Sequence, residues 1–179
     1  MKQGLAILVM FECVNFRQIL SVLDGGSASD SRWKLLQKEA CYKGKNDFPA
    51  KVEINQYGAL VAVKLVYISG RMKCANSFIG SYFGCFSDQT LFNLAITDEN
   101  KIVLFPPPNH AITYIDSSKN YRYPGYLPTD KEVVFTNYAY PTYFKSGDYI
   151  SIWNYEDLLD YGDTDNFGEV CMDVYGAFV

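Results

Sequence analysis

Near the C-terminus, apolar and polar side chains alternate with a period of two residues. In residues 149–155, Ile150 and Ile152 fall on one side of an extended chain, and Trp153 falls on the other with tyrosines and a serine. The same alternation returns in residues 170–178. Because successive side chains of a strand point to opposite faces, this period indicates two half-buried strands joined by an acidic loop.

The clearest strand earlier in the chain lies within residues 52–69. Its segment ALVAVKLVYIS is apolar on both faces except at Lys64, which indicates a central strand buried on both sides. Residues 91–97 and 101–105 flank a short polar turn and predict a hairpin. Further runs predicted as strands are residues 33–41, which would also suit a helix, 112–115 and 132–138.

The count is therefore seven or eight strands at roughly regular spacing, with turn residues between them. Such spacing is typical of a sandwich and differs from the alternation of strands and helices in α/β proteins. The fifteen tyrosines favour the same class, because Tyr suits pleated, half-exposed surfaces. We predict an all-β, single-domain antiparallel β-sandwich, jelly-roll-like and disulfide-stapled, over residues 30–179.

The N-terminus resembles a signal peptide. Lys2 precedes an apolar run over residues 5–11, and a second apolar group over residues 19–23 precedes small residues. We predict that residues 1–29 hold a signal peptide and short linker, with cleavage between residues 13 and 29; a buried N-terminal helix is the alternative. No apolar run has the length of about 18 residues that a membrane span needs.

The cysteines agree with export. Cys13 would leave with the signal peptide, and the four that stay form an even set, as in a secreted disulfide framework. The short gap between Cys74 and Cys85 suits one bridge, which leaves Cys41 to pair with Cys171 and tie the first strand to the last. The alternative is a cytosolic protein with free buried thiols. None of the pairs has the spacing of a zinc site.

Charge is distributed unevenly along the chain. Residues 146–179 carry eight acidic side chains and no basic one, whereas the rest carries twelve acidic and sixteen basic residues. No Lys/Arg cluster provides a surface for nucleic acid. The acidic end could attract a cation or a basic partner, or could simply be solvated.

Calcium is the sharpest chemical prediction for this acidic end. Calcium needs six to eight oxygen ligands, which a dense group of carboxylates and amides supplies. The loop lacks the residues of an EF-hand at its fifth and twelfth positions, so any site is of another kind. The alternative is that the Asp and Asn side chains cap their own turns. The predicted ligands are Asp160, Asp163, Asp165, Asn166 and Glu169.

A second candidate site is aromatic and basic. Tyrosine rings beside Arg and Lys are common on surfaces that stack sugars or contact proteins, although they also pack around Pro-Gly turns. An extracellular glycan or protein would be the partner. The predicted ligand-binding residues are Tyr121, Arg122, Tyr123, Tyr126 and Trp153.

Several short motifs occur in an order that suggests a family. The closing segments IWNYEDL and DNFGEVCMDVYGAF follow VKLVYISG, SYFGC, FPPPN and YPGY. Together they resemble a group of secreted, largely uncharacterised modules of cnidarian (coral and sea-anemone) proteins, which end in IWxxEDL and then DNxGxVCxDVYA. The resemblance covers about residues 41–179 and implies a secreted β-domain without established catalytic residues. The chain departs from the pattern at Asn154 and Tyr155, where an aromatic residue and then Gly are expected.

Enzymatic chemistry finds little support. His110, the only histidine, lies in a predicted loop, and no nucleophile elbow or phosphate loop is present. A carboxylate pair such as Glu156 and Asp160 would serve glycoside hydrolysis only at a suitable separation. We therefore expect no enzyme but a secreted binding module, lectin-like or adhesive, with a calcium-binding acidic loop. The alternatives are a structural matrix or secretion component and, last, a glycosidase-like enzyme.

Overall fold

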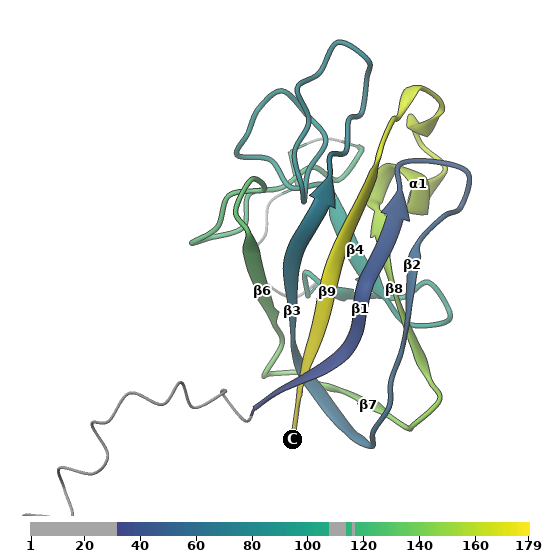
Figure 1. Ribbon diagram of the computed structural model, residues 1–179, viewed down its shortest axis with the longest axis vertical. Coiled ribbons are helices and arrows are strands. Elements are labelled where there is room, and N and C mark those ends of the chain that lie inside the picture. The colour runs from purple at the N-terminus through teal and green to yellow at the C-terminus, as the bar shows by residue number, and fades with distance from the viewer. Residues whose placement is uncertain (1–31, 108–113, 116) are drawn as a thin grey trace, which may run out of the picture. The chain divides into compact units, whose positions relative to one another are not determined.

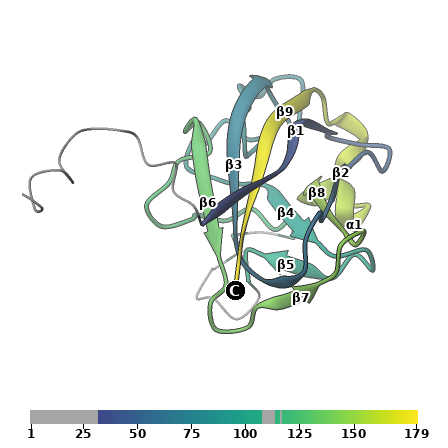
Figure 2. The same ribbon diagram turned by 60° about the horizontal axis from the view of Figure 1, so that its bottom comes forward.

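The computed structural model describes residues 32–107, 114–115 and 117–179. Its nine strands form two antiparallel sheets, which Figures 1 and 2 show as separate layers. One sheet has the order β1-β9-β3-β6, with β7 also paired to β3, and the other has the order β2-β8-β4-β5. The first sheet comprises β1 (Trp33–Lys43), β9 (Glu169–Phe178), β3 (Gly58–Gly70), β6 (Glu132–Thr136) and β7 (Thr142–Phe144). The second comprises β2 (Ala50–Glu53), β8 (Tyr149–Asn154), β4 (Leu94–Thr97) and β5 (Val103–Phe105).

The strand pairing is nested. With β7 set aside, β1 pairs with β9, β2 with β8, β3 with β6 and β4 with β5, all antiparallel. This is the pattern of one long hairpin rolled into two facing sheets, the jelly roll. The predicted all-β, jelly-roll-like sandwich is confirmed.

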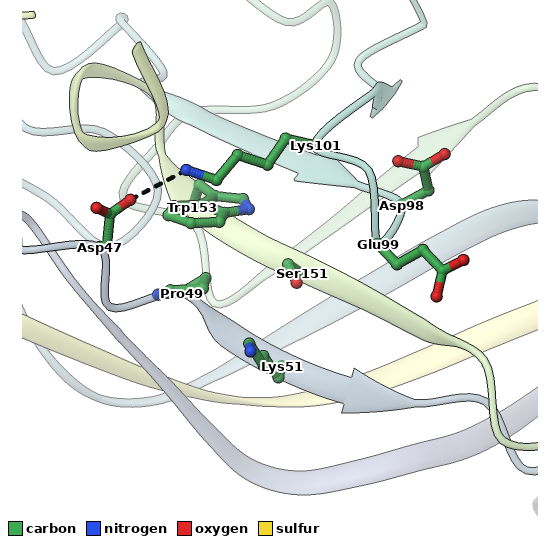
Figure 3. Close-up of a pocket in the computed structure, with 8 residues that line it drawn as sticks. All are labelled: Asp47, Pro49, Lys51, Asp98, Glu99, Lys101, Ser151 and Trp153. Carbon is green, nitrogen blue, oxygen red and sulfur yellow. Dashed lines mark hydrogen bonds and ion pairs between the residues drawn. The ribbon is translucent and has the colours of Figure 1, made fainter. Parts of the chain in front are cut away.

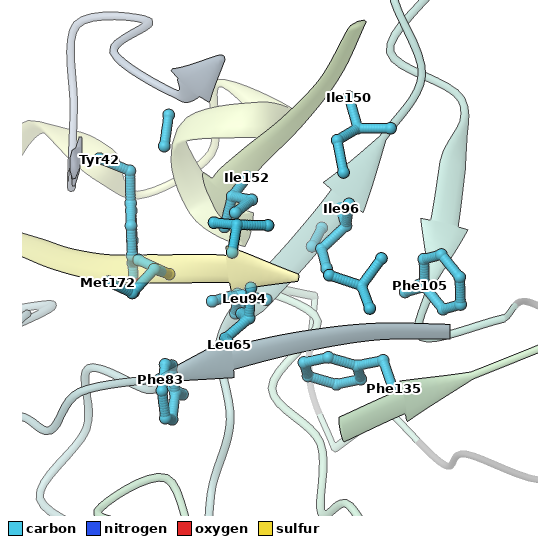
Figure 4. Close-up of a cluster of buried hydrophobic side chains, with 14 of the residues drawn as sticks. Tyr42, Leu65, Phe83, Leu94, Ile96, Phe105, Phe135, Ile150, Ile152 and Met172 are labelled. Carbon is cyan, nitrogen blue, oxygen red and sulfur yellow. The ribbon is translucent and has the colours of Figure 1, made fainter. Parts of the chain in front are cut away.

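The core lies between the two sheets. Ile150 and Ile152 of β8 are fully buried and face Leu65 and Met172 of the opposite sheet (Figure 4). The two isoleucines pack inward, as the period of two residues predicted, but Ser151 and Trp153 on the opposite face are buried too, so β8 is not the half-buried strand expected. The largest fully buried side chains include Tyr42, Tyr121, Phe83, Phe92, Phe105 and Phe135.

Two disulfides reinforce the sandwich. One joins Cys41 on β1 to Cys171 on β9, and the other joins Cys74 to Cys85 within the β3–β4 connection. These are the pairs that the spacing favoured. Residues 33–41 form β1 and not a helix, because β1 pairs antiparallel with β9, with two register shifts before Cys41.

The connection between β8 and β9 differs from the prediction. The strand predicted over residues 149–155 ends at Asn154, and Tyr155 begins the short helix α1 (Tyr155–Leu159). A single turn of 3-10 helix, η2 (Asp163–Asp165), follows. The Asn154 side chain causes the change, because its oxygen accepts hydrogen bonds from the backbone N–H groups of Glu156 and Asp157 and so caps the helix.

Some predictions concern residues outside the described ones. They are the signal peptide and linker of residues 1–29, the loop position of His110, and most of the strand predicted over residues 112–115. Among the described residues, no helix has the length and apolar character that crossing a membrane requires.

Candidate functional site

A groove runs over the outer face of the four-stranded sheet, on the side of β8 that carries Ser151 and Trp153, which alternate with the core isoleucines (Figure 3). One cavity of the groove has a volume of about 330 Å³. Ser151 lies at the centre, directly opposite Lys51 on β2 and Thr97 on β4. The β1–β2 loop contributes Asp47, and the β4–β5 turn closes the other side.

The β4–β5 turn is built by Asp98. Its carboxylate accepts hydrogen bonds from the backbone N–H groups of Asn100 and Ile102, both at 2.9 Å. Lys101 consequently adopts a left-handed backbone conformation, with φ of 60°. This turn carries Glu99 and Lys101 over the groove. The predicted hairpin is confirmed, and its turn supplies one wall of the site.

Trp153 forms one end of the groove and is only 4% exposed. Its indole N–H donates to the hydroxyl of Thr97 at 3.2 Å, which fixes the ring against β4. The ammonium of Lys101 lies 4.8 Å from the ring centroid and 3.1 Å from the carboxylate of Asp47. Figure 3 shows the Lys101 side chain crossing the indole to reach Asp47. The aromatic face is therefore covered by a cation.

Lys51 and Glu99 provide the free charges of the groove. Among the described residues, neither side chain makes a hydrogen bond or an ion pair, and both are exposed. They also line a second cavity of about 370 Å³ together with Ser151 and Tyr149. An ammonium donor and a carboxylate acceptor thus flank the same hollow, with the Ser151 hydroxyl between β2 and the turn.

The groove continues toward β7. A smaller cavity of about 140 Å³ shares Asp98, Glu99 and Tyr149 with the others and adds Tyr143. Tyr143 is 62% exposed and Tyr149 is 43% exposed. Two accessible phenol rings therefore lie along the path that begins at Trp153.

The structure separates the predicted ligand-binding residues. Tyr121 is fully buried and its hydroxyl donates to the carbonyl of Leu94, so its assignment to a binding surface is wrong. Burial of its ring also raises its pKa. A tyrosine this far inside packs as a core residue, here stacked on Phe92.

The other aromatic and basic residues of that set lie in two places. Tyr123 stacks on Tyr126 and packs against Phe135, and both tyrosines are half-buried. Arg122 is exposed and pairs with Asp88 at 3.3 Å. Trp153 is the one member of the predicted set that lines the groove on the four-stranded sheet.

The five predicted calcium ligands have different surroundings. Asp160 and Asp165 are exposed, Asp163 is half-buried, and Glu169 pairs with Lys43 at 3.7 Å. Asn166 is fully buried and donates to the carbonyl of Gly44. Within the described part of the chain, these carboxylates do not converge; the only sets of three possible ligand residues include both cysteines of a disulfide.

A network of buried asparagine side chains holds the connection between β8 and β9, which carries the acidic loop. The Asn154 side-chain oxygen also accepts from the amide of Asn166, and Asn93 accepts from the backbone N–H of Tyr155. The side-chain amide nitrogen of Asn154 and the side-chain oxygen of Asn166 are buried without a partner in the described structure. A buried water with polar neighbours commonly fills such a position.

Asp157 links this network to the groove. It is 1% exposed, and its carboxylate accepts hydrogen bonds from the backbone N–H groups of Asp47 and Phe48, at 3.0 and 3.3 Å. Burial raises the pKa of Asp157, and the nearby charges of Asp47 and Asp163 raise it further. The two hydrogen bonds lower this pKa but do not offset the effect of burial. Asp157 therefore holds the β1–β2 loop that presents Asp47.

The two carboxylates considered for glycoside hydrolysis have different surroundings. Glu156 is 4% exposed and its carboxylate lies within 4.8 Å of the buried Cys74 and Cys85 sulfurs, whereas Asp160 is exposed on the loop.

Sequence reasoning missed most of the groove. Lys51, Glu99, Lys101 and Ser151 come from three segments that no local pattern connects. The available signals were weak: Lys51 alternates with the apolar residues of β2, and Asp98 and Glu99 occupy a hairpin turn.

Fold and surface together define a disulfide-linked jelly-roll domain with a polar groove on one sheet, an architecture that lectin domains share. A solved lectin structure, AJLec from the sea anemone Anthopleura japonica, is similar to this chain, with a TM-score of 0.74 and 29% sequence identity. The match covers 82% of this chain and 97% of AJLec. Its source agrees with the cnidarian resemblance of the short motifs. No family model and no curated protein matches the chain.

Proposed function

We propose that this chain is a secreted carbohydrate-binding module, and that it binds extracellular glycans in the groove on the outer face of β2, β8 and β4. The likeness to AJLec, a lectin, over nearly the whole of that chain carries the proposal. It favours a binding role over catalysis. The two disulfides suit the oxidising environment of a secreted protein.

The groove has the chemistry that a sugar requires. Hydroxyl groups both donate and accept hydrogen bonds, and Lys51, Glu99 and Ser151 offer a donor, an acceptor and a group that does both. The C–H faces of a pyranose pack on aromatic rings, which Tyr149 and Tyr143 present along the groove. Cavities that share Glu99 and Tyr149 extend beyond a single site, so we infer an oligosaccharide ligand.

Calcium at the acidic loop is part of the proposal. Asp160, Asp163, Asp165 and Glu169 would approach one another around the ion, and the unpartnered oxygen of buried Asn166 is a further hard ligand. The loop connects through α1 and Asp157 to the Asp47 side of the groove. Calcium would then support the groove indirectly.

A glycan array of the purified, oxidised domain, run with calcium and again with EDTA, tests the proposal. We expect retention of particular oligosaccharides, weakened by EDTA. If no glycan is retained with calcium or with EDTA, and the protein self-assembles, the result would instead favour a structural matrix role and overturn carbohydrate binding. Retention that EDTA leaves unchanged would overturn only the calcium component.

A further inference from the structure

The Trp153 indole is the most completely positioned aromatic ring of the groove, yet its exposed face is occupied. Thr97 holds the indole N–H, and the Lys101 ammonium covers the ring while pairing with Asp47. The Lys101 and Asp47 side chains are 51% and 59% exposed. A cover made from exposed groups is held weakly, because exposed ion pairs and exposed cation–π contacts each contribute little.

Both residues of this cover have an unusual backbone. Lys101 has φ of 60° and Asp47 has φ of 54°, a left-handed conformation that residues with a Cβ rarely adopt. Each is held there by a carboxylate: Asp98 organises the β4–β5 turn, and Asp157 accepts from the backbone N–H of Asp47. Glycine would fit either position more easily. Strain kept at two facing positions that meet over one ring indicates a role beyond folding.

We propose that Lys101 and Asp47 form a displaceable lid over Trp153, and that an oligosaccharide ligand moves the Lys101 ammonium aside so that a neutral sugar ring stacks on the indole. Lys101 then sets specificity as well as affinity. A ligand must displace a cation from the ring, which disfavours cationic sugars such as amino sugars with a free amine. The freed ammonium stays beside Asp47 at the rim.

The ligand half of this role rests on the proposed carbohydrate binding, whereas the lid itself is measurable without any ligand. The chain has two tryptophans, so Trp33→Phe leaves Trp153 as the only indole reporter. In that background, Lys101→Gly removes the cover and relieves the left-handed strain, which protects the fold. Lys38→Ala, an exposed lysine on β1, is the matched control.

Acrylamide quenching of Trp153 fluorescence is measured first, on ligand-free protein. We expect Lys101→Gly to raise the quenching constant, Asp47→Asn to raise it less because Lys101 can still contact the ring, and Lys38→Ala to leave it unchanged. Equal quenching in the Trp33→Phe parent and its Lys101→Gly derivative would overturn the lid, whatever the glycan results.

Affinity for neutral oligosaccharides retained on the array is then measured by titrating the same fluorescence. We expect Lys101→Gly to bind about tenfold more tightly, the effect of removing one weak ion pair and one weak cation–π contact. Weaker binding by Lys101→Gly would show that Lys101 is a ligand contact and overturn displacement. If no variant binds an oligosaccharide while Lys101→Gly still raises the quenching constant, carbohydrate binding is contradicted. The lid geometry then stands, but the proposed role of Lys101 in specificity is overturned because no ligand displaces it.

Discussion

Cys41 and Cys171 are directly opposed on β1 and β9, with their Cα atoms 4.0 Å apart and a sequence separation of 130. The bond joins the outermost pair of the nested strand pairs. The groove, the acidic loop and the strands from β2 to β8 lie inside the loop that it closes. It therefore limits the unfolded chain more than any local crosslink would.

Replacing both cysteines, Cys41→Ala with Cys171→Ala, should lower the free energy of unfolding by up to about 5 kcal/mol, because the closed loop is long. The matched double substitution at Cys74 and Cys85 removes a bond that closes a much shorter loop, with a sequence separation of 11. It should lower the free energy of unfolding by less, about 3 kcal/mol. Urea denaturation of both variants without reductant measures the difference. A larger loss from the short loop would contradict the chain-entropy explanation.

Asn154→Ala should destabilise the domain by about 2–3 kcal/mol, because it removes the helix cap of α1 and leaves the buried amide of Asn166 with one partner fewer. Chemical denaturation gives the magnitude. Asn76→Ala, at an exposed position, is the control and should change stability by less than about 0.5 kcal/mol. Equal stability of the two variants would show that α1 does not depend on its cap.

The raised pKa of Asp157 predicts a pH dependence of stability. Between its ordinary value of 3.8 and the raised value, the folded protein binds more protons at this carboxyl than the unfolded chain does. The contribution of Asp157 is therefore most favourable below pH 3.8 and is lost as pH rises through the folded pKa. Relative to Asp157→Asn, the wild type should gain stability as pH falls through this window.

Urea denaturation of wild type and Asp157→Asn at several pH values between 3.5 and 7 checks this expectation, with Glu53→Gln as a control at an exposed carboxylate. A stability difference between wild type and Asp157→Asn that is flat with pH, or that moves the other way, would contradict the raised pKa.

Calcium should raise the melting temperature if it binds the acidic loop of the folded protein. At a concentration about 100 times the dissociation constant, binding to the folded state alone stabilises by about 2.7 kcal/mol. Asp163→Asn with Asp165→Asn should abolish the shift, whereas Glu132→Gln, on β6 far along the chain from the loop, should keep it. Thermal denaturation with calcium, magnesium or EDTA makes the measurement. No shift in the wild type at millimolar calcium would reject the site.

Lys51→Ala and Glu99→Ala should each weaken binding to the retained oligosaccharide by about tenfold, since each removes one hydrogen-bonding group from the groove. Their folding should be unaffected, because neither side chain has a partner among the described residues. Glu132→Ala and Lys38→Ala remove the same charges from the other sheet and should bind normally. Affinities unchanged by all four variants would place the glycan elsewhere on the domain.

Local patterns in the sequence identified several of the strands. The alternation around Ile150 and Ile152 places both isoleucines on the core face of β8, because the period of two residues needs no information from other segments. The long apolar run through Lys64 identified β3 as a central strand for the same reason, and β3 indeed lies between β9 and β6. The cysteine spacing indicated how the ends of the sandwich meet.

The end of β8 at Asn154 was decided by tertiary contacts. Tyr155 continues the alternation, so the sequence predicts another strand residue there, but Asn93 and Asn166 reach it from distant segments and stabilise a capped helix. The prediction that Tyr121 binds ligand was wrong for a related reason. A tyrosine suits both a surface and a core, and only its packing against Phe92 shows that it belongs to the core.

By itself, the sequence determined the all-β class, the strand faces and the acidic character of the last segment, since these follow from the order of neighbouring residues. Only the tertiary structure decided where chemistry is possible. Lys51, Glu99 and Trp153 belong to separate segments, and hydrogen bonds between β2, β8 and β4 bring them to one groove. No periodicity records which strands become neighbours when a hairpin rolls into two sheets, so the site arises from the fold.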